Sequence, residues 1–184
     1  MIRFFLSVGA KNSLCYDTLV KFKVEHLFKN VTIQAYEQLY FDEKFNISLC
    51  QAVNLERELV HRNIENNILQ RSTKVRPKRT LPRPVAAVMG TAKIEYTENI
   101  SYALGSHQGT WQTISGVLSD KIESKGTVQF IDRPDGVIRI IEGEIRVKIF
   151  GVGSMVEKLI VADVEKSYAE AASFTQKWLD EHSV

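Results

Sequence analysis

Hydrophobic and polar residues alternate along residues 21–28, which predicts a β-strand with one buried face. The apolar face of this strand consists of Phe22, Val24, His26 and Phe28. Two short helices are predicted next. Thr32 is a suitable N-cap for a helix over Ile33–Phe41, and Ser48 lies near a second helical segment that ends at about Val53.

Strand character then recurs through the middle of the chain. The six further predicted strands are Leu55–His61, Ile64–Val75, Ala92–Tyr102, Thr110–Leu118, Lys121–Ile131 and Val137–Ile149. Asn66 and Asn67 predict a bulge or a later start in the second of these, and a change of phase at Gly143 predicts a bulge in the last. Two prolines exclude a central strand over residues 77–90, which are predicted as a loop.

A long amphipathic helix is predicted over residues 154–181, because this stretch lacks Gly and Pro and has a helical hydrophobic period. Ser154 and Glu157 match the capping box that marks helix N-termini. The apolar stripe of the helix consists of Val156, Ile160, Val164, Tyr168, Ala171, Phe174 and Trp178. At roughly 40 Å, the helix is long enough for a curved sheet to wrap around it.

The composition is that of an ordinary globular domain, with 184 residues of which 44% are hydrophobic and 25% charged. We expect one domain over residues 21–182, preceded by an N-terminal extension over residues 1–20. The first ten residues make a poor signal peptide, and no apolar run is long enough to span a bilayer. Cys15 and Cys50 do not form a disulfide framework, so we expect a reducing compartment such as the cytoplasm.

Several polar side chains interrupt faces that are otherwise apolar: His26, Arg57, His61 and Glu98. A charge on an inner face is unfavourable unless it is paired. Glu98 is therefore expected to meet Arg57, His26 or a ligand, or to lie at the open end of the sheet. His26 has two interpretations, a structural histidine or a ligand contact, and Arg57 and His61 are expected near a strand end.

The sequence contains no phosphate-binding loop, dinucleotide-binding, HExxH or serine-nucleophile motif. Its four histidines are far apart, so no metal and no cofactor is expected. Enzymatic activity is an alternative, because general acid–base catalysis needs only a carboxylate and an imidazole near a bound substrate. Glu98 and His26 are the pair that would serve it.

Six basic residues lie within residues 71–83. Along one exposed rim, these side chains would contact an anionic membrane surface while a lipid enters the protein. The candidates for this contact are Lys74, Arg76, Lys78, Arg79 and Arg83. A solvated sheet edge is the alternative interpretation, and nucleic-acid binding is not favoured because no aromatic platform accompanies the charges.

The order of elements resembles the helix-grip fold of the START and birch-pollen-allergen superfamily, also called polyketide-cyclase-like (SRPBCC). Three stretches resemble the bacterial family named domain of unknown function 2505: Phe22–Phe28, Gly151–Ile160 and Ala172–Leu179. The resemblance implies an α+β helix-grip fold, with a seven-stranded curved antiparallel sheet around a long C-terminal helix and two short helices after the first strand. It also implies an apolar cavity for hydrophobic small molecules.

We therefore expect the chain to bind a hydrophobic or amphipathic small molecule, such as a lipid, between the sheet and the C-terminal helix. The expected cavity residues are Phe22, Val24, His26, Arg57, Tyr96, Glu98, Tyr102, Ile160, Val164, Tyr168, Ala171 and Phe174. Small residues such as Ser167 and Ala171 on the helix favour incomplete filling, although a solid core is the alternative. A cyclase- or hydrolase-like enzyme using Glu98 and His26, and a lipid-transfer module docking through Arg71–Arg83, also remain open.

Overall fold

The computed structural model describes residues 19–78, 80, 81, 83, 86, 87, 90, 93–149 and 153–182. Its labelled strands are β1 (Leu19–Lys29), β2 (Leu55–Glu65), β3 (Ile68–Pro77), β4 (Tyr96–Ala103), β5 (Gln108–Ser115), β6 (Ile122–Arg133) and β7 (Gly136–Val147). Its labelled helices are α1 (Ile33–Phe41), α2 (Glu43–Ala52) and α4 (Gly153–Glu181). Residues 1–18 of the expected N-terminal extension and parts of the expected 77–90 loop lie outside the described residues, and Leu19 and Val20 already belong to β1.

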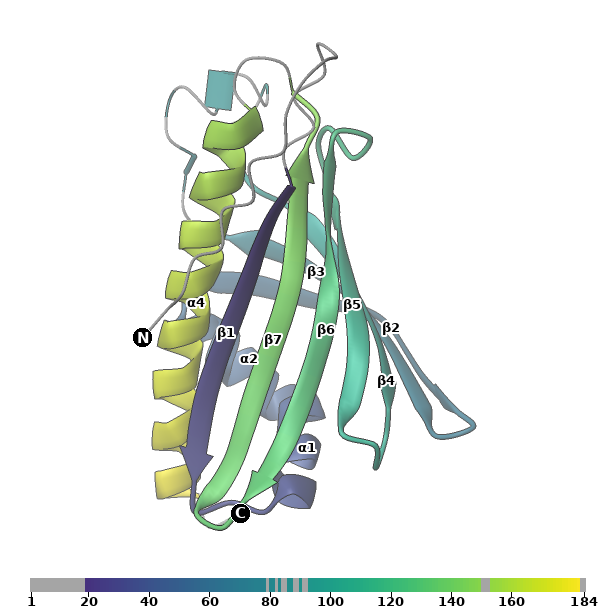
Figure 1. The fold of residues 1–184 in the computed structure, drawn as a ribbon, viewed down its shortest axis with the longest axis vertical. Helices are drawn as coiled ribbons and strands as arrows, with labels where there is room; N and C mark the ends of the chain where they lie inside the picture. The colour runs from purple at the N-terminus through teal and green to yellow at the C-terminus, as the bar shows by residue number, and fades with distance from the viewer. Residues whose placement is uncertain are drawn as a thin grey trace, which may run out of the picture.

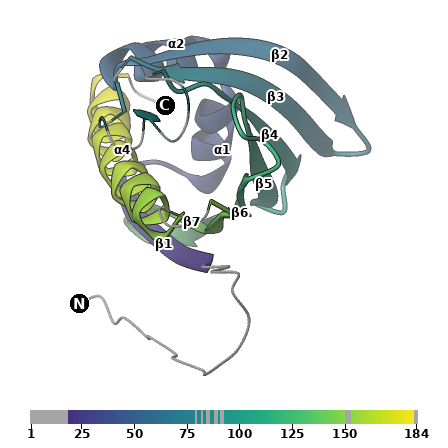
Figure 2. The same ribbon diagram turned by 90° about the horizontal axis from the view of Figure 1, so that it is seen from above.

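The seven strands form one antiparallel sheet in the order β1-β7-β6-β5-β4-β3-β2. Consecutive strands are therefore neighbours, except that β1 pairs with β7 at the end of the sheet. The sheet curves around an interior that α4 closes on the opposite side (Figure 2). α1 lies at the lower end of the sheet in Figure 1, and α2 contacts both β2 and α4. The predicted α+β architecture, with two short helices after the first strand and a long C-terminal helix, is confirmed.

Side-chain caps fix where the two short helices begin. The Thr32 hydroxyl accepts a hydrogen bond from the Ala35 N–H (3.3 Å) at the start of α1, as the sequence predicts. Asp42 ends α1 and also caps α2, because its carboxylate accepts from the Phe45 N–H (2.7 Å). The second helix therefore begins earlier than expected, and Ser48 lies inside it.

Two predicted strands begin later than the sequence pattern indicated. Asn66 and Asn67 both have left-handed backbone angles, with φ of 51° and 62°, and form the tight turn between β2 and β3. Ile64, the predicted start of the second middle strand, therefore belongs to β2. β4 starts at Tyr96, and the expected start at Ala92 lies outside the described residues.

β7 is continuous, so the bulge predicted at Gly143 is wrong. Both β1 and β6 pair with β7 without a shift of register. The irregularity lies in β2 instead, between Leu59 and His61. Because the alternation along β7 is unbroken, its odd-numbered residues share the inner face, and this places Arg139 in the interior.

The first turn of α4 is tied to the end of β7. Ser154 lies inside the helix and is exposed, so the predicted capping box is wrong. Glu157 has no exposed surface, and its carboxylate accepts a hydrogen bond from the Val147 N–H (2.8 Å). This charge-assisted bond joins the last residue of β7 to the start of α4.

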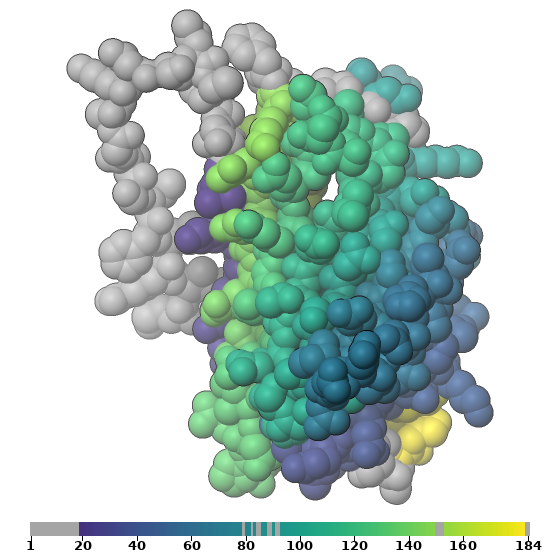
Figure 3. Space-filling view, turned by 90° about the vertical axis from the view of Figure 1, so that its right-hand side faces the viewer, coloured from purple at the N-terminus to yellow at the C-terminus, as the bar shows by residue number. Residues whose placement is uncertain are grey.

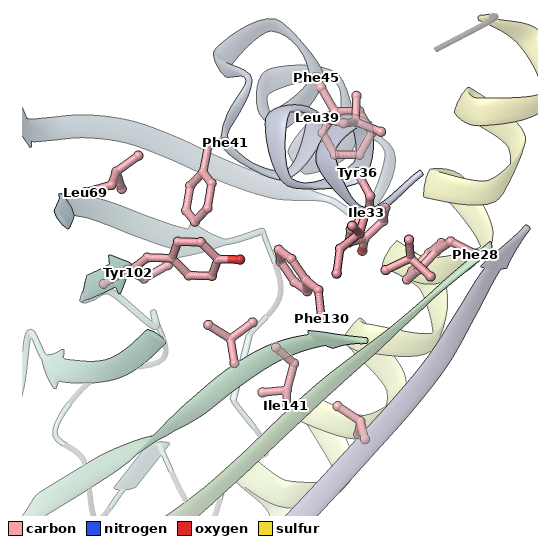
Figure 4. Close-up of a cluster of buried hydrophobic side chains, with 14 of the residues drawn as sticks. Phe28, Ile33, Tyr36, Leu39, Phe41, Phe45, Leu69, Tyr102, Phe130 and Ile141 are labelled. Atoms are coloured by element: carbon pink, nitrogen blue, oxygen red, sulfur yellow. The ribbon is translucent and has the colours of Figure 1, made fainter. Parts of the chain in front are cut away.

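Aromatic residues fill the end of the interior that α1 closes (Figure 4). The Tyr36 ring stacks on Phe28 (4.7 Å between centroids) and meets Phe130 edge-on (5.0 Å). Phe41 meets Tyr102 in the same edge-on way (4.7 Å). Such ring pairs stabilise the fold beyond the apolar area that they bury. The densest packing is therefore at the α1 end.

Glu37 joins α1 to the hairpin between β4 and β5. Its carboxylate accepts hydrogen bonds from the Tyr102 hydroxyl (2.9 Å) and the Gly105 N–H (3.2 Å). The His107 Nδ1 lies 2.8 Å from the same carboxylate. These contacts span residues far apart in sequence, so the carboxylate holds the helix on the sheet. Tyr102, expected in the cavity, is buried in this contact.

Replacing this carboxylate by the isosteric amide tests the role of Glu37. In Glu37→Gln, the amide NH₂ faces donors, so we expect the free energy of unfolding to fall by about 1–3 kcal/mol. Urea denaturation followed by circular dichroism measures the change. Glu65→Gln, at an exposed position at the end of β2, is the control, and equal effects of both substitutions would contradict the assigned role.

Candidate functional site

α4 packs closely on the rest of the protein at its two ends and less closely in its middle. Val156 near its start is buried, and so are Thr175 and Leu179 near its end. Between them, Ile160, Val164 and Tyr168 point along the apolar stripe but are only half-buried. Of the labelled elements, β1, β7 and α2 are the ones that α4 contacts extensively. The middle of the helix therefore packs against the core but is less completely covered than its ends.

A cavity of about 1100 Å³ lies across the middle of the sheet. Its wall includes one residue from each of six paired strands, in a row that runs from β1 to β3: Phe22, Gly143, Gly126, Trp111, Ile100 and Arg71. The exposed Glu165 of α4 is also part of the wall, so the cavity borders the helix at this residue. The upper part of the sheet face seen in Figure 3 is hollowed between teal and green side chains.

Two glycines in this row make room for an aromatic pair. A Cβ atom at Gly143 would lie 2.5 Å from Cζ2 of Trp111 and 2.8 Å from the Phe22 ring. Gly126, its neighbour on β6, is similarly covered by the indole. Phe22 and Trp111 can therefore approach across two intervening strands, to 6.0 Å between ring centroids. They form an apolar wall of the cavity.

Three arginine side chains point into the interior. Arg57 forms an ion pair with Glu43 of α2, and Arg71 lies 3.6 Å from the Glu98 carboxylate. Arg139 lies between two aromatic rings, 5.0 Å from the centroid of Phe28 and 5.5 Å from that of Tyr168. Arg71 and Arg139 are only 6% and 3% exposed. The Glu98 partner is therefore Arg71, a residue that the sequence analysis assigned to the basic stretch.

The structure does not bring His26 and Glu98 together. β7, β6 and β5 lie between the strands that carry them. His26 is half-buried beside Arg139, and its Nδ1 has no hydrogen-bond partner among the described residues. Burial lowers the pKa of His26, and the Arg139 charge lowers it further. The imidazole is therefore held neutral and away from the carboxylate.

Tyrosine hydroxyls add neutral polar groups to the interior. Burial raises the pKa of Tyr40, the Glu98 charge raises it further, and Arg139 and Arg71 act in the opposite direction. Burial likewise raises the pKa of Tyr168, with smaller effects from Tyr40, Glu98 and Arg139. Both phenols stay protonated and can donate or accept a hydrogen bond.

The remaining expected cavity residues occupy different environments. Val24 is buried in the core, and Tyr96 is half-buried on the inner face of β4. Ala171 is half-buried on α4, whereas Phe174 packs against Phe45 of α2 (6.2 Å). The sequence analysis missed five residues of the interior: Arg71, Trp111, Gly126, Arg139 and Gly143. The alternation of Leu69, Thr73 and Val75 was the available signal for Arg71.

Carboxylates neutralise most of the described basic residues on β3. Arg76 donates to Glu95 (2.6 Å) and Glu58 (3.3 Å), and Lys74 lies 3.6 Å from Glu95. The remaining expected contacts of the basic stretch are Lys78, which pairs with Glu56 at 3.8 Å, the exposed Arg83, and Arg79, which lies outside the described residues. Arg71 is turned inward, and among the described residues of this stretch the basic side chains of β3 are each close to a carboxylate.

Metal-binding and membrane-spanning features are absent from the part of the chain that the structure describes. Its His, Cys, Asp and Glu side chains form no group of three or more that could hold a metal ion. None of its helices combines the length and apolar character needed to cross a bilayer. Cys50 is a half-buried free thiol, and burial raises its pKa, which disfavours the reactive thiolate.

Solved structures of other proteins share this architecture. The TTHA0849 protein of Thermus thermophilus has a TM-score of 0.60 and 16% identity, covering 84% of this chain and 95% of that chain. Norcoclaurine synthase of Thalictrum flavum has a TM-score of 0.56 and 16% identity, covering 99% and 100%. The Zhui aromatase/cyclase of a Streptomyces species has a TM-score of 0.58 and 8% identity, covering 89% and 96%. At these identities the similarity shows the helix-grip fold alone.

Sequence comparison identifies the family. No curated protein matches the chain. A family model described as "Protein of unknown function (DUF2505)" matches residues 26–179. The matched range begins within β1 and ends within α4, so it includes β2 to β7, most of the cavity wall and most of the long helix. The chain therefore belongs to the family described as protein of unknown function DUF2505.

Proposed function

We propose that the protein binds a hydrophobic or amphipathic small molecule, such as a lipid, in the cavity between the sheet and α4. The observation that carries the proposal is the cavity of about 1100 Å³ beside the half-buried middle of α4. Small-molecule sites are commonly clefts of roughly 300–1000 Å³ with apolar walls and a few polar groups. The volume here is sufficient for a molecule of lipid size.

The chemistry of the walls supports an apolar ligand body. Phe22, Ile100 and Trp111 contribute aromatic and aliphatic surface from three strands. Polar and charged residues also line the cavity, among them Gln70, Asn99 and Gln112, and Arg71 lies where it can orient a ligand. Burial of apolar ligand surface against such walls supplies most of the binding free energy.

Two neighbours in fold support small cyclic molecules as one ligand class. One is an aromatase/cyclase, and a structure of norcoclaurine synthase (TM-score 0.55, 16% identity) is a complex with dopamine and hydroxybenzaldehyde. Catalysis is not part of our proposal, because Glu98 is paired with Arg71 and His26 lies beyond three intervening strands.

Filling the cavity with a large side chain tests the proposal. We expect the unchanged protein to bind the neutral dye Nile red, and Val164→Trp to bind it about tenfold more weakly because the indole occupies ligand space. Fluorescence titration measures both affinities. Lys166→Trp places the same side chain on the exposed face of α4 and should leave binding unchanged.

Mass spectrometry of an organic extract of the purified protein provides an independent measurement. A co-purifying apolar molecule, depleted in Val164→Trp but retained in Lys166→Trp, is the expected result. A protein that yields no such molecule and also fails to enhance Nile red fluorescence would contradict the proposed function.

Docking on anionic membranes is the less favoured alternative, since Glu56, Glu58 and Glu95 neutralise the basic side chains of β3. We expect the triple variant Lys74→Gln, Arg76→Gln and Lys78→Gln to leave vesicle binding unchanged. Sedimentation with phosphatidylserine vesicles at low and physiological salt measures it. A large, salt-dependent loss of binding in the variant would instead support docking through this stretch.

A further inference from the structure

The interior contains one positive charge that no described carboxylate neutralises. Arg57 pairs with Glu43 and Arg71 with Glu98. Arg139 is 3% exposed, and the structure gives it two aromatic contacts but no ion pair with a described residue. A buried charge without a counterion is strongly unfavourable, because the low-dielectric interior does not replace the solvation lost from water.

The groups around Arg139 leave its donors unused. Its Nε and Nη2 have no hydrogen-bond partner in the described part of the chain. Phe28 and Tyr168 stabilise the charge through their ring faces. They do not accept hydrogen bonds from the N–H groups, which point outward in the plane of the guanidinium. His26 is the paired residue on β1, and the Tyr36 hydroxyl is nearby. Neither group carries a negative charge near neutral pH.

Arg71 lies on the same inner face of the sheet, on β3, with β6, β5 and β4 between it and Arg139 on β7. It lines the cavity, its guanidinium lies 5.3 Å from the centroid of Phe41, and its Nε and Nη1 lack partners among the described residues. Tyr40 lies between the two arginines. The centroid of its ring lies 5.0 Å from that of Phe41, which contacts Arg71, and 6.5 Å from that of Tyr36, which is near Arg139. Spare guanidinium donors thus flank one end of an aromatic interior.

Phe22 and Trp111 line the cavity, whereas Arg139 lies outside its wall, on the same inner face of β7 as the wall residue Gly143. We propose that the ligand is an amphipathic anion, whose apolar body lies in the cavity against Phe22 and Trp111 and whose carboxylate extends along this inner face to bind Arg139. A carboxylate accepts two N–H bonds from the guanidinium fork and supplies the missing negative charge. Arg71 contributes further donors and retains Glu98 as its own counterion. This inference rests on the proposed function, since it specifies the chemical class of the molecule that occupies the same cavity.

The test compares two probes that differ only in charge, cis-parinaric acid and its methyl ester. We expect the unchanged protein to bind the acid about tenfold more tightly than the ester, as the contribution of a charge-assisted pair implies. In Arg139→Met, which keeps an apolar side chain of similar length, the acid should bind no better than the ester. Fluorescence titration at neutral pH measures both affinities, and Nile red reports whether the cavity is intact.

Arg133→Met is the matched control, because Arg133 is an exposed arginine at the end of β6. It should preserve the preference for the acid. Removing an unneutralised buried charge should also leave the melting temperature of Arg139→Met unchanged or higher. If that variant does not fold, Arg139→Gln removes the same charge and is held to the same comparison.

Three results would overturn the inference: no preference of the unchanged protein for the acid, a preference that survives in Arg139→Met, or an equal loss of both probes in that variant. Each of these leaves Nile red binding by the unchanged protein, and therefore the proposed function, in place. Failure of Nile red and both parinaric probes to bind the unchanged protein would remove the proposed function itself.

Discussion

The position of α4 on the sheet depends on contacts at the two ends of the helix. At its start, the buried Glu157 carboxylate binds the backbone of Val147, the last residue of β7. At its end, Gln176 accepts a hydrogen bond from the Lys29 N–H (2.8 Å), at the last residue of β1, and Leu179 is buried. Between these contacts the apolar stripe of the helix is only half-buried. The ends of the helix are therefore fixed more firmly than its middle.

Packing at the α1 end explains how the protein tolerates the cavity. The rings of Phe28, Tyr36 and Phe130 form a compact group there, and Glu37 fixes α1 to the β4–β5 hairpin. Apolar burial at this end and the continuous strand pairing supply the stability that the middle of the molecule lacks. The aromatic group at the α1 end therefore contributes to stability without lining the cavity.

Most of the fold could be predicted from the sequence, because its elements have strong periods. The alternation in β1, the Thr32 cap of α1 and the apolar stripe of α4 each depend on neighbouring residues alone. The Glu157 contact could not be predicted, because its partner is the backbone of another element. The predicted end of β2 and start of β3 differ from the structure, because the sequence does not distinguish a turn at Asn66 and Asn67 from a bulge.

The charged part of the candidate site was hidden by its sequence neighbours. Arg139 stands between Ile138 and Ile140, so a local reading turns those isoleucines inward and the arginine outward. Ile141 pairs with the buried Val24 of β1 and Val128 of β6, and this reverses that assignment. Arg71 was obscured in the same way by the basic residues that follow it. Periodicity over a whole strand, rather than over a few residues, carries the information.

Gly143 limits how the cavity beside Trp111 can be filled. A methyl group there would push the indole of Trp111 off the strand surface and into the chamber. The volume of the cavity therefore depends on the absence of a side chain at Gly143. A larger residue at this single site would narrow the cavity beside Phe22 and Trp111 without touching the contacts at the ends of the long helix.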